Sequence, residues 1–275
     1  MNIGNSYKVP GYHHINMLNG YAFPKDKSTV FKYMPLDRLV QSVDKGVLVF
    51  VSPETWYDPF EQLYYGIDCT SKGYATEDIA CMCVSEKSST NEDASWRVYA
   101  GTNNKTVRIS LEQDKLLQLL DGYAEFNGFE VFIGKVDYSF DKREIKSIYL
   151  PSSPCYKDYF PNVMRREHYL SLMLLKRKAF RYENEVRLFL VKDNVSFDSN
   201  NLLKIPCDYR KLGIISNVML SPYPPVRAEG DMAFRIREKM NMLESNEIKS
   251  ILTAKLGCRV QQSLLYKVCS RINSV

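Results

Sequence analysis

Short apolar runs alternate with polar turns along the chain, and their spacing predicts both strands and helices. Residues 30–33 are typical of a short strand, and residues 47–51 are typical of a buried one. Between them, Pro35 opens a helix whose apolar side chains recur at helical spacing on one face. Gly46 follows the last of them and is a typical helix end. This stretch therefore predicts a strand, a helix, a glycine and a second strand.

The rest of the chain continues this mixture of elements. Further strands are predicted at residues 79–85, 106–111, 131–138, 186–191, 217–221 and 259–265. Helices are predicted at residues 96–100, 112–120, 162–178 and 231–256, and a mobile loop at residues 88–94. Residues 1–28 are polar and turn-rich, and we expect them to form an N-terminal arm or an irregular cap. Residues 29–275 should fold as a single α+β domain with a central mixed β-sheet and helical insertions.

The composition is that of an ordinary globular protein, with 45% hydrophobic and 25% charged residues among 275. Three histidines are too few for a His-rich metal site, and we expect no metal. The net charge of +5 permits an anionic partner without requiring one. The sequence has no Gly-rich phosphate loop, no nucleophile elbow and no paired Cys–His motif. These absences argue against the common nucleotidases, kinases and α/β hydrolases.

The cysteines and the apolar runs indicate the compartment. Seven cysteines lie mostly singly or in apolar runs, as buried reduced thiols do. Cys81 and Cys83 have no second pair to complete a zinc site. The N-terminus has no signal pattern, and no apolar run approaches the roughly 18 residues that span a bilayer. We therefore expect a cytoplasmic protein with no membrane partner.

The most informative motif is the acidic pair Glu183 and Glu185, which precedes an apolar strand. Carboxylates spaced by two at a strand entrance point to the same face. Two carboxylates that lie this close together raise each other's pKa, and proteins use this effect to tune an acid or a base. The alternative is a pair of solvated acids near Arg and Lys. Arg187 lies inside the apolar strand, and a buried Arg needs a partner, for which Glu185 is the natural candidate.

Basic residues surround this acidic pair: Arg165, Arg166, Lys176, Arg177, Lys178 and Arg181. They could hold a pyrophosphate or a nucleic-acid backbone. Alternatively, they form the solvated face of the helix predicted at residues 162–178, and this reading is favoured for most of them.

Aromatic and polar side chains elsewhere could line a ligand pocket. The loop at residues 52–61 contains Trp56, Asp58 and Phe60, which could stack on a planar ring or hold a hydroxyl group. Its alternative is a structural turn at Asp58 with Phe60 in the core. Trp96 and Tyr99 lie three residues apart on one predicted helix face, a pattern more often found in a core. Lys32 and Tyr33 end the first predicted strand, where the lysine could bind phosphate or remain in water.

These motifs occur together in an order that resembles the bacterial family called domain of unknown function 2971. The resemblance covers nearly the whole chain, from about residue 31 to residue 263. The motifs are Lys32-Tyr33, Asp58-Pro59-Phe60-Glu61, Cys83-Val84-Ser85, Trp96-x-x-Tyr99-Ala100, Val107-x-Ile109, Val136-x-Tyr138, Lys178-x-x-x-Tyr182-Glu183-x-Glu185-x-Arg187 and Val218-x-Leu220-Ser221-Pro222. Each is weak alone, and the family name implies no function.

The chain is more distantly similar to ADP-ribosyltransferases, which build a small split sheet around a bound NAD. In that family a basic residue or a histidine ends the first strand. A helix and a glycine then lead to the next strand, and a Glu-x-Glu or a single Glu lies near a late strand. Lys32, Gly46, the loop aromatics and the acidic pair occur here in the same order. The resemblance implies an ADP-ribosyltransferase-like fold and activity, with NAD as substrate.

The same resemblance implies roles for particular residues. Glu185 would lie beside the ribose, where a carboxylate stabilises oxocarbenium charge, and Glu183 would deprotonate the acceptor. The residues implied to bind NAD are Lys32, Tyr33, Trp56, Asp58, Phe60, Trp96, Tyr99 and Arg187. The acceptor would be a protein or a nucleic acid, and the protein a bacterial toxin or a phage-defence effector. An antitoxin is a further candidate partner.

Two rival hypotheses remain open at this point. The first is a nucleic-acid enzyme or binding protein that uses the basic residues around the acidic pair. The second is a non-catalytic interaction protein, in which Glu183, Glu185 and Arg187 form a buried ion network that only stabilises the strand.

Overall fold

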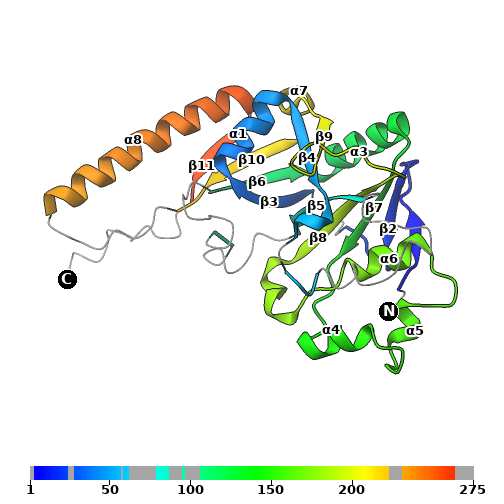
Figure 1. The fold of residues 1–275 in the computed structure, drawn as a ribbon. Coiled ribbons are helices and arrows are strands. Elements are labelled where there is room, and N and C mark those ends of the chain that lie inside the picture. Colours follow the sequence, from blue (N-terminus) through cyan, green and yellow to red (C-terminus); the bar gives the residue numbers. More distant parts are fainter. Residues whose placement is uncertain are drawn as a thin grey trace.

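The computed structural model describes residues 3–23, 28–56, 58–61, 79–86, 95–96, 106–222 and 231–263. The described chain is mixed α/β, with one open mixed sheet of 11 strands (Figure 1). Across the sheet the strands lie in the order β1 (Ser6–Lys8), β2 (Ile15–Leu18), β7 (Glu130–Lys135), β8 (Glu185–Val191), β5 (Ile79–Ser85), β3 (Thr29–Pro35), β6 (Thr106–Glu112), β10 (Ile215–Leu220) and β11 (Arg259–Gln262). β4 (Val47–Val51) pairs with β9 (Leu202–Pro206) and joins β5. The prediction of a mixed sheet is therefore confirmed.

The sheet divides at β5. One side of this strand pairs with β8 along its whole length, from Ile79 to Ser85. Its other side meets β3 only where Phe31 faces Ser85, and β4 only where Val51 faces Cys81. β3 and β4 therefore leave β5 at different points and continue as two arms, one with β6 and the other with β9. We call this opening in the sheet the split.

Helices cover both faces of the sheet (Figure 1). One hydrophobic core lies under α1 (Leu36–Lys45), α3 (Gln113–Asn127) and α8 (Asp231–Leu256), and it receives Leu188 from β8. A second core lies under α4 (Lys142–Ile148), α5 (Tyr156–Tyr159) and α6 (Arg166–Leu172), and it receives the neighbouring Phe189. Because both faces are covered, every residue of β8 is buried.

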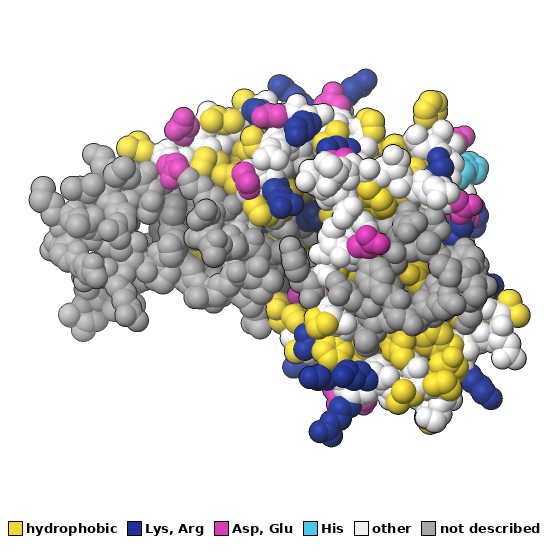
Figure 2. Space-filling view, in the orientation of Figure 1, with side chains coloured by type: hydrophobic (Ala, Val, Ile, Leu, Met, Phe, Trp, Pro, Cys, Tyr) yellow, Lys and Arg dark blue, Asp and Glu magenta, His cyan; other side chains and the backbone are white. Residues whose placement is uncertain are grey.

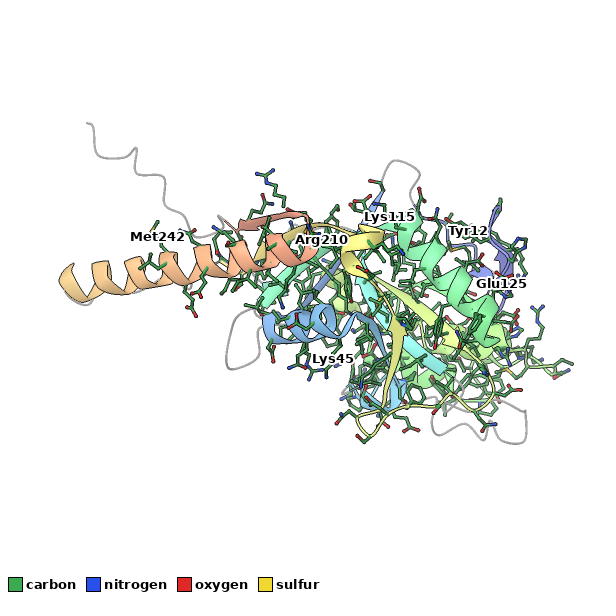
Figure 3. The ribbon with its side chains drawn as sticks, turned by 90° about the horizontal axis from the view of Figure 1, so that it is seen from above. Tyr12, Lys45, Lys115, Glu125, Arg210 and Met242 are labelled. Carbon is green, nitrogen blue, oxygen red and sulfur yellow. The ribbon has the colours of Figure 1, made fainter. Side chains whose placement is uncertain are left out.

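The surface is uneven in charge and in shape. Lys and Arg side chains gather at the lower edge of the space-filling view, where α4 lies (Figure 2). Seen from above, α8 extends beyond the sheet, and Met242 lies on this projecting part (Figure 3). Within the described residues, no helix is both long enough and apolar enough to cross a membrane.

Local signals placed α1 correctly. The helix follows Pro35, whose fixed backbone angle suits the first turn, and it ends at Gly46 in the left-handed conformation, with φ of 59°. The strands that the sequence predicts around residues 30–33, 47–51, 79–85, 106–111, 186–191 and 217–221 are confirmed, with shifted ends. The helix at residues 231–256 is one continuous α8, followed by Gly257 with φ of 68°.

The predicted N-terminal arm is wrong for two segments. β2 is fully buried and pairs in parallel with β7, while β1 pairs with β2 at the edge of the sheet. Ile15 and Leu18 are both 0% exposed. The run of β2 is only four residues long and lies among turn residues, so its burial depends on a partner strand more than 100 positions away. β9, α4, α5 and α7 (Tyr209–Leu212) were not predicted either.

The long helix predicted at residues 162–178 is also wrong. α6 ends at Leu172, and the chain then runs beside the end of β7 through an isolated bridge between Asp137 and Leu175. The Lys176 N–H donates to the Asp137 carbonyl at 3.1 Å, and the Asp137 N–H donates to the Leu174 carbonyl at 2.8 Å. These bonds replace the helical ones that the sequence pattern favoured. A 3₁₀ helix, η5 (Lys178–Glu183), then leads into β8.

Tyr99, the loop at residues 88–94 and most of the helix predicted at residues 96–100 lie outside the described residues.

Candidate active site

Five ionisable side chains meet at the start of β8, on the face that carries α4 to α6. They are Glu61, Lys176, Glu183, Glu185 and Arg187, which together we call the charged cluster. Their side-chain exposure ranges from 1% for Arg187 to 11% for Lys176. Charges buried to this degree are stable only when they are paired.

Arg187 is the centre of the cluster. Its Nε donates to Oε1 of Glu185 at 2.9 Å, and its Nη2 donates to Glu61. Its Nη1 donates to the carbonyl oxygen of Met173. The guanidinium carbon lies 4.1 Å from the centroid of the Trp56 ring, as in a cation–π contact. The predicted partnership of Arg187 with Glu185 is thus confirmed, and the guanidinium is held from several directions.

Lys176 joins the three carboxylates of the cluster. Its Nζ lies 2.6 Å from Oε2 of Glu183 and 3.1 Å from Oε2 of Glu185. It also lies 3.6 Å from Oε1 of Glu61. The predicted proximity of the two glutamates is therefore observed, and a shared ammonium group separates them.

The two glutamates differ in acidity. Burial raises the pKa of Glu183 to about 7, because it outweighs Lys176, and the charge of Glu185 adds to the rise. Burial alone would also raise the pKa of Glu185, but the charges of Arg187 and Lys176 outweigh it and hold that pKa well below its usual value. The net shift of Glu185 is therefore opposite to the one expected for a carboxylate beside another, because two cations are its partners. Near neutral pH, Glu185 is ionised and Glu183 is poised to exchange a proton.

Neighbouring groups fix the entrance of β8. Asn184 adopts the left-handed conformation with φ of 44°, which turns the chain between the two glutamates. The Glu185 N–H donates to the hydroxyl oxygen of Tyr138 at 3.1 Å. Burial raises the pKa of Tyr138, so the phenol stays protonated. A hydrogen bond with Cys81, together with burial, raises the pKa of Cys83 beside Glu185, so that thiol also stays neutral.

The loop residues Asp58 and Phe60 lie at the rim of the cluster. Asp58 accepts a hydrogen bond from the Phe60 N–H at 3.0 Å, so the structural turn considered from the sequence is present. The same carboxylate also pairs with Arg177 at 3.1 Å. The Arg177 guanidinium lies 4.7 Å from the Phe60 ring centroid and 4.9 Å from that of Phe180. Trp56 therefore contacts the cluster through Arg187, while Asp58 and Phe60 lie beside it through Arg177. The predicted role of these three residues in binding NAD stays a prediction.

Lys32, Tyr33 and Trp96 lie apart from the cluster, on or against β3. The rings of Tyr33 and Trp96 meet edge to face at 5.1 Å, and both are buried. Lys32 crosses the split and donates to the Cys83 carbonyl at 3.0 Å. This bond joins β3 to the strand that carries Cys83, and it brings Lys32 only to the edge of the site.

Sequence reasoning did not assign Glu61 or Lys176 to the site. Glu61 is the last residue of the Asp-Pro-Phe-Glu motif, and its place in this motif was the feature of the sequence that could have assigned it to the site. Lys176 follows the apolar pair Leu174 and Leu175, but it also begins the basic run with Arg177 and Lys178, so its position in the sequence does not set it apart. It was included among solvated helix residues because the helix was predicted to be too long.

Gly134 supports the cluster from β7, where it lies opposite Arg187. A Cβ at this position would overlap Cδ1 of Leu174 and approach its Cδ2 to 3.2 Å. Leu174 directly follows Met173, whose carbonyl accepts from Arg187. The absent side chain therefore allows the backbone acceptor for Arg187 to lie close to the sheet.

Gly134→Ala is expected to destabilise the protein by about 1–3 kcal/mol through overpacking against buried Leu174. Urea unfolding measures the change. Gly122→Ala is the matched control, because Gly122 lies in α3 with no atom within 4 Å of an added Cβ. That change should stabilise the helix by about 0.5–1 kcal/mol. Equal effects at the two glycines would contradict the role given to Gly134.

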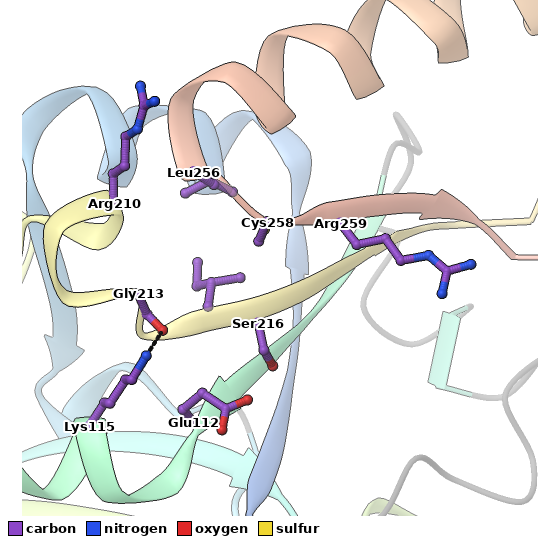
Figure 4. Close-up of a pocket in the computed structure, with 10 residues that line it drawn as sticks. Glu112, Lys115, Arg210, Gly213, Ser216, Leu256, Cys258 and Arg259 are labelled. Carbon is purple, nitrogen blue, oxygen red and sulfur yellow. Dashed lines mark hydrogen bonds between the residues drawn. The ribbon is translucent and has the colours of Figure 1, made fainter.

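One hollow adjoins the candidate site, and a larger one lies away from it. One, of about 270 Å³, shares Tyr138 with the site and is also lined by Leu174 and Leu175. The other, of about 670 Å³, lies between α3, α7 and β11, away from the charged cluster (Figure 4). There Lys115 donates to the Gly213 carbonyl at 3.0 Å, while the Arg210 and Arg259 side chains point away (Figure 4). The larger hollow therefore lacks converging cations.

Comparisons with models of known protein families and with curated proteins find no match for this chain. The resemblances drawn from the motifs thus stay predictions. Within the described residues, no group of three or more His, Cys, Asp or Glu side chains is placed to hold a metal ion.

Proposed function

We propose that the protein transfers ADP-ribose from NAD to a macromolecular acceptor, as a bacterial toxin or phage-defence effector. The observation that carries this proposal is the geometry of the pair: Nζ of Lys176 lies 2.6 Å from Oε2 of Glu183 and 3.1 Å from Oε2 of Glu185, and only Glu185 is also held by Arg187. In this setting burial raises the pKa of Glu183, while the charges of Arg187 and Lys176 lower that of Glu185. Two neighbouring carboxyl groups with opposite shifts can divide the tasks of proton transfer and charge stabilisation. The split in the sheet adds support, since it agrees with the ADP-ribosyltransferase-like fold that the motifs imply.

The first event is cleavage of the bond between the ribose C1′ and the nicotinamide nitrogen, whose electron pair leaves with neutral nicotinamide. The ribose gains oxocarbenium character, as a sugar does in glycoside hydrolysis. Glu185 is the group suited to stabilise this charge and to accept a hydrogen bond from the ribose 2′-hydroxyl. Arg187 and Lys176 act as positioning residues, because they hold the carboxylate ionised and fixed.

The second event is attack of an acceptor oxygen or nitrogen on C1′. The acceptor loses a proton as its new bond forms, and Glu183 takes that proton as a general base. A base is most effective when its pKa lies near the working pH, which a value of about 7 satisfies. The products are nicotinamide, the ADP-ribosylated acceptor and one proton.

Aromatic and basic side chains would bind NAD. Trp56 and Phe60 lie beside the cluster and are suited to the nicotinamide ring. Tyr33 and Trp96 were implied to bind NAD as well, but their rings are buried against each other, so they are suited to support the β3 arm and not to stack on the adenine. Lys32 supplies a cation near the split for the pyrophosphate.

The direct test is incubation with NAD labelled in its adenylate phosphate, together with a cell lysate. The expected result is label in acid-precipitable material and release of nicotinamide from the wild-type protein. If the wild-type protein neither transfers label nor consumes NAD, the proposal is wrong.

A pH profile tests the role of Glu183. The rate of ADP-ribose transfer to the acceptor should rise with pH through an apparent pKa of about 7, as this carboxyl loses its proton. Glu183→Gln should remove that limb and lower the rate of transfer by about 100-fold. A profile with the same limb in the variant would show that another group is the base.

The same pKa shift predicts how stability depends on pH. The carboxyl of Glu183 titrates at about 7 in the folded protein, against a usual value of 4.5. The folded state therefore binds the proton more tightly, and this stabilisation is lost as pH rises from about 4.5 to 7. Relative to wild type, Glu183→Gln should become more stable over that interval in urea titrations. A difference that does not change with pH would contradict the assigned pKa.

A further inference from the structure

A cationic surface borders the charged cluster. It is formed by α4 and η5, and its members are Lys142, Lys146, Arg177, Lys178 and Arg181, which we call the cationic rim. Residues 140–183, which contain it, carry ten Lys and Arg against five Asp and Glu. That excess of five equals the net charge of +5 of the whole protein. The Lys and Arg in the remainder of the chain are balanced by an equal number of Asp and Glu, so the net positive charge comes from the segment that contains the rim.

Several of these cations remain available for a ligand. Lys142, Lys146 and Arg181 are exposed, and none of them forms an ion pair with a described residue. Lys178 pairs with Glu144 at 3.2 Å, but both side chains are about half exposed, so this pair is weak. Arg177 pairs with Asp58 and is the one member that is held in place.

Aromatic rings lie among these cations. The ring centroid of Phe60 lies 5.6 Å from Nζ of Lys142 and 5.9 Å from Nζ of Lys146. The Arg177 guanidinium lies over the rings of both Phe60 and Phe180, at 4.7 and 4.9 Å. The rings of both phenylalanines are only partly buried. Cations that follow a phosphate backbone, interleaved with rings on which bases stack, are the usual means of holding single-stranded nucleic acid.

The rim leads directly to the acidic pair. Nζ of Lys176 lies 5.2 Å from the Phe180 ring centroid and 2.6 Å from Oε2 of Glu183. A chain bound along α4 and η5 would therefore pass beside the carboxyl group that we assign as the acceptor's base. One pyrophosphate would not require cations spread over two elements, whereas a polymer of phosphates would use them all.

We infer that the cationic rim binds single-stranded nucleic acid and presents it to Glu183. The idea that this nucleic acid accepts ADP-ribose rests on the proposed function. The binding of nucleic acid to the cationic rim does not. A peptide made only of acidic residues would also be attracted by the charge, but it has no rings to stack on Phe60 and Phe180. A duplex hides the faces of its bases, so it too would make poorer use of these side chains.

The test is fluorescence anisotropy without NAD, using labelled single strands of about 20 uridines or thymidines. Further arms contain a duplex of the same length and a poly-glutamate peptide. Both single strands should bind, and their affinity should fall steeply between about 50 and 200 mM salt. The RNA and DNA arms show which backbone is preferred.

The variant Lys142→Glu/Lys146→Glu should weaken binding at least tenfold and reduce the salt slope by about 1.4, since each phosphate contact contributes about 0.7. Phe60→Leu should weaken binding by about tenfold while leaving the slope unchanged. The control Lys45→Glu/Lys211→Glu makes the same change in net charge on α1 and α7, and it should leave binding within about twofold. Lys45 lies on α1, on the far side of the molecule from α4 (Figures 1 and 3).

Three results would overturn the inference: no binding at low salt, equal losses in the two double variants, or equal affinity for poly-glutamate. Transfer of labelled ADP-ribose to protein but not to bound oligonucleotide would remove the acceptor role. If oligonucleotides bind but NAD is never consumed, only the proposed function is wrong. The two ideas can therefore fail separately.

Discussion

Arg187→Met is expected to lower the free energy of unfolding by about 3–5 kcal/mol. The Arg187 side chain is 1% exposed, and it pairs with the carboxylates of Glu61 and Glu185, which are 7% and 6% exposed. Methionine has a similar length but no charge, so both carboxylates would remain buried without their main counter-ion. The Met173 carbonyl would also lose its donor.

Urea unfolding at neutral pH measures this loss, and two further variants make it interpretable. Arg187→Lys keeps the charge but loses the planar fork, so its stability should lie between those of wild type and Arg187→Met. Arg38→Met replaces an exposed arginine on α1 and should change stability by no more than about 0.5 kcal/mol. If Arg187→Met unfolds at the same urea concentration as wild type, the cluster does not depend on this residue.

Glu185→Gln should abolish most of the NAD chemistry, with a loss of about 100- to 1,000-fold in rate. The amide cannot offer a negative charge to the developing oxocarbenium centre. The variant should nevertheless remain folded, because two ion pairs of the cluster are kept. Arg187 still pairs with Glu61, and Lys176 still pairs with Glu183. After the change, two carboxylates face two cations, so no charge is left without a counter-ion.

This separation of folding from activity decides between a catalytic site and a structural network. Loss of the charged hydrogen bonds should cost about 1–3 kcal/mol in Glu185→Gln, measured by thermal or urea unfolding. The matched control is Glu125→Gln, on the exposed surface of α3 (Figure 3), which should leave both rate and stability unchanged. If Glu185→Gln unfolds the protein, the purely structural hypothesis is favoured. If it stays folded and fully active, Glu185 has no catalytic role.

The sequence predicted the elements whose signals are local. Pro35 and Gly46 mark the two ends of α1. The apolar run after Glu185 marks β8, and all seven residues of this strand, Glu185 included, are buried. β2 and β9 were missed, since four or five residues with short-range patterning become strands only when distant strands pair with them. The predicted helix at residues 162–178 was wrong for a similar reason. Backbone bonds to Asp137 outweighed the helical preference of the segment after Leu172.

The candidate site shows the same difference between local contacts, which the sequence predicts, and long-range contacts, which it does not. Glu185 and Arg187 are two residues apart on one strand, so their contact follows from the geometry of the strand. Glu61 is 126 positions from Arg187, and no single-sequence pattern predicts that they meet. The pKa of Glu183 could not be predicted either, because it depends on burial and on Lys176. Lys176 itself was placed on a solvated helix that does not exist.

The split has a consequence for how the protein avoids its own aggregation. Where two arms leave β5, no strand of the described residues pairs with part of its backbone, and an unpaired strand edge is a template for pairing with another chain. Sheet proteins often protect such edges with an inward-pointing lysine. Lys32 takes this position, because its ammonium group occupies the Cys83 carbonyl that an added strand would need. A residue first considered as a phosphate ligand thus also guards an internal sheet edge against strand addition.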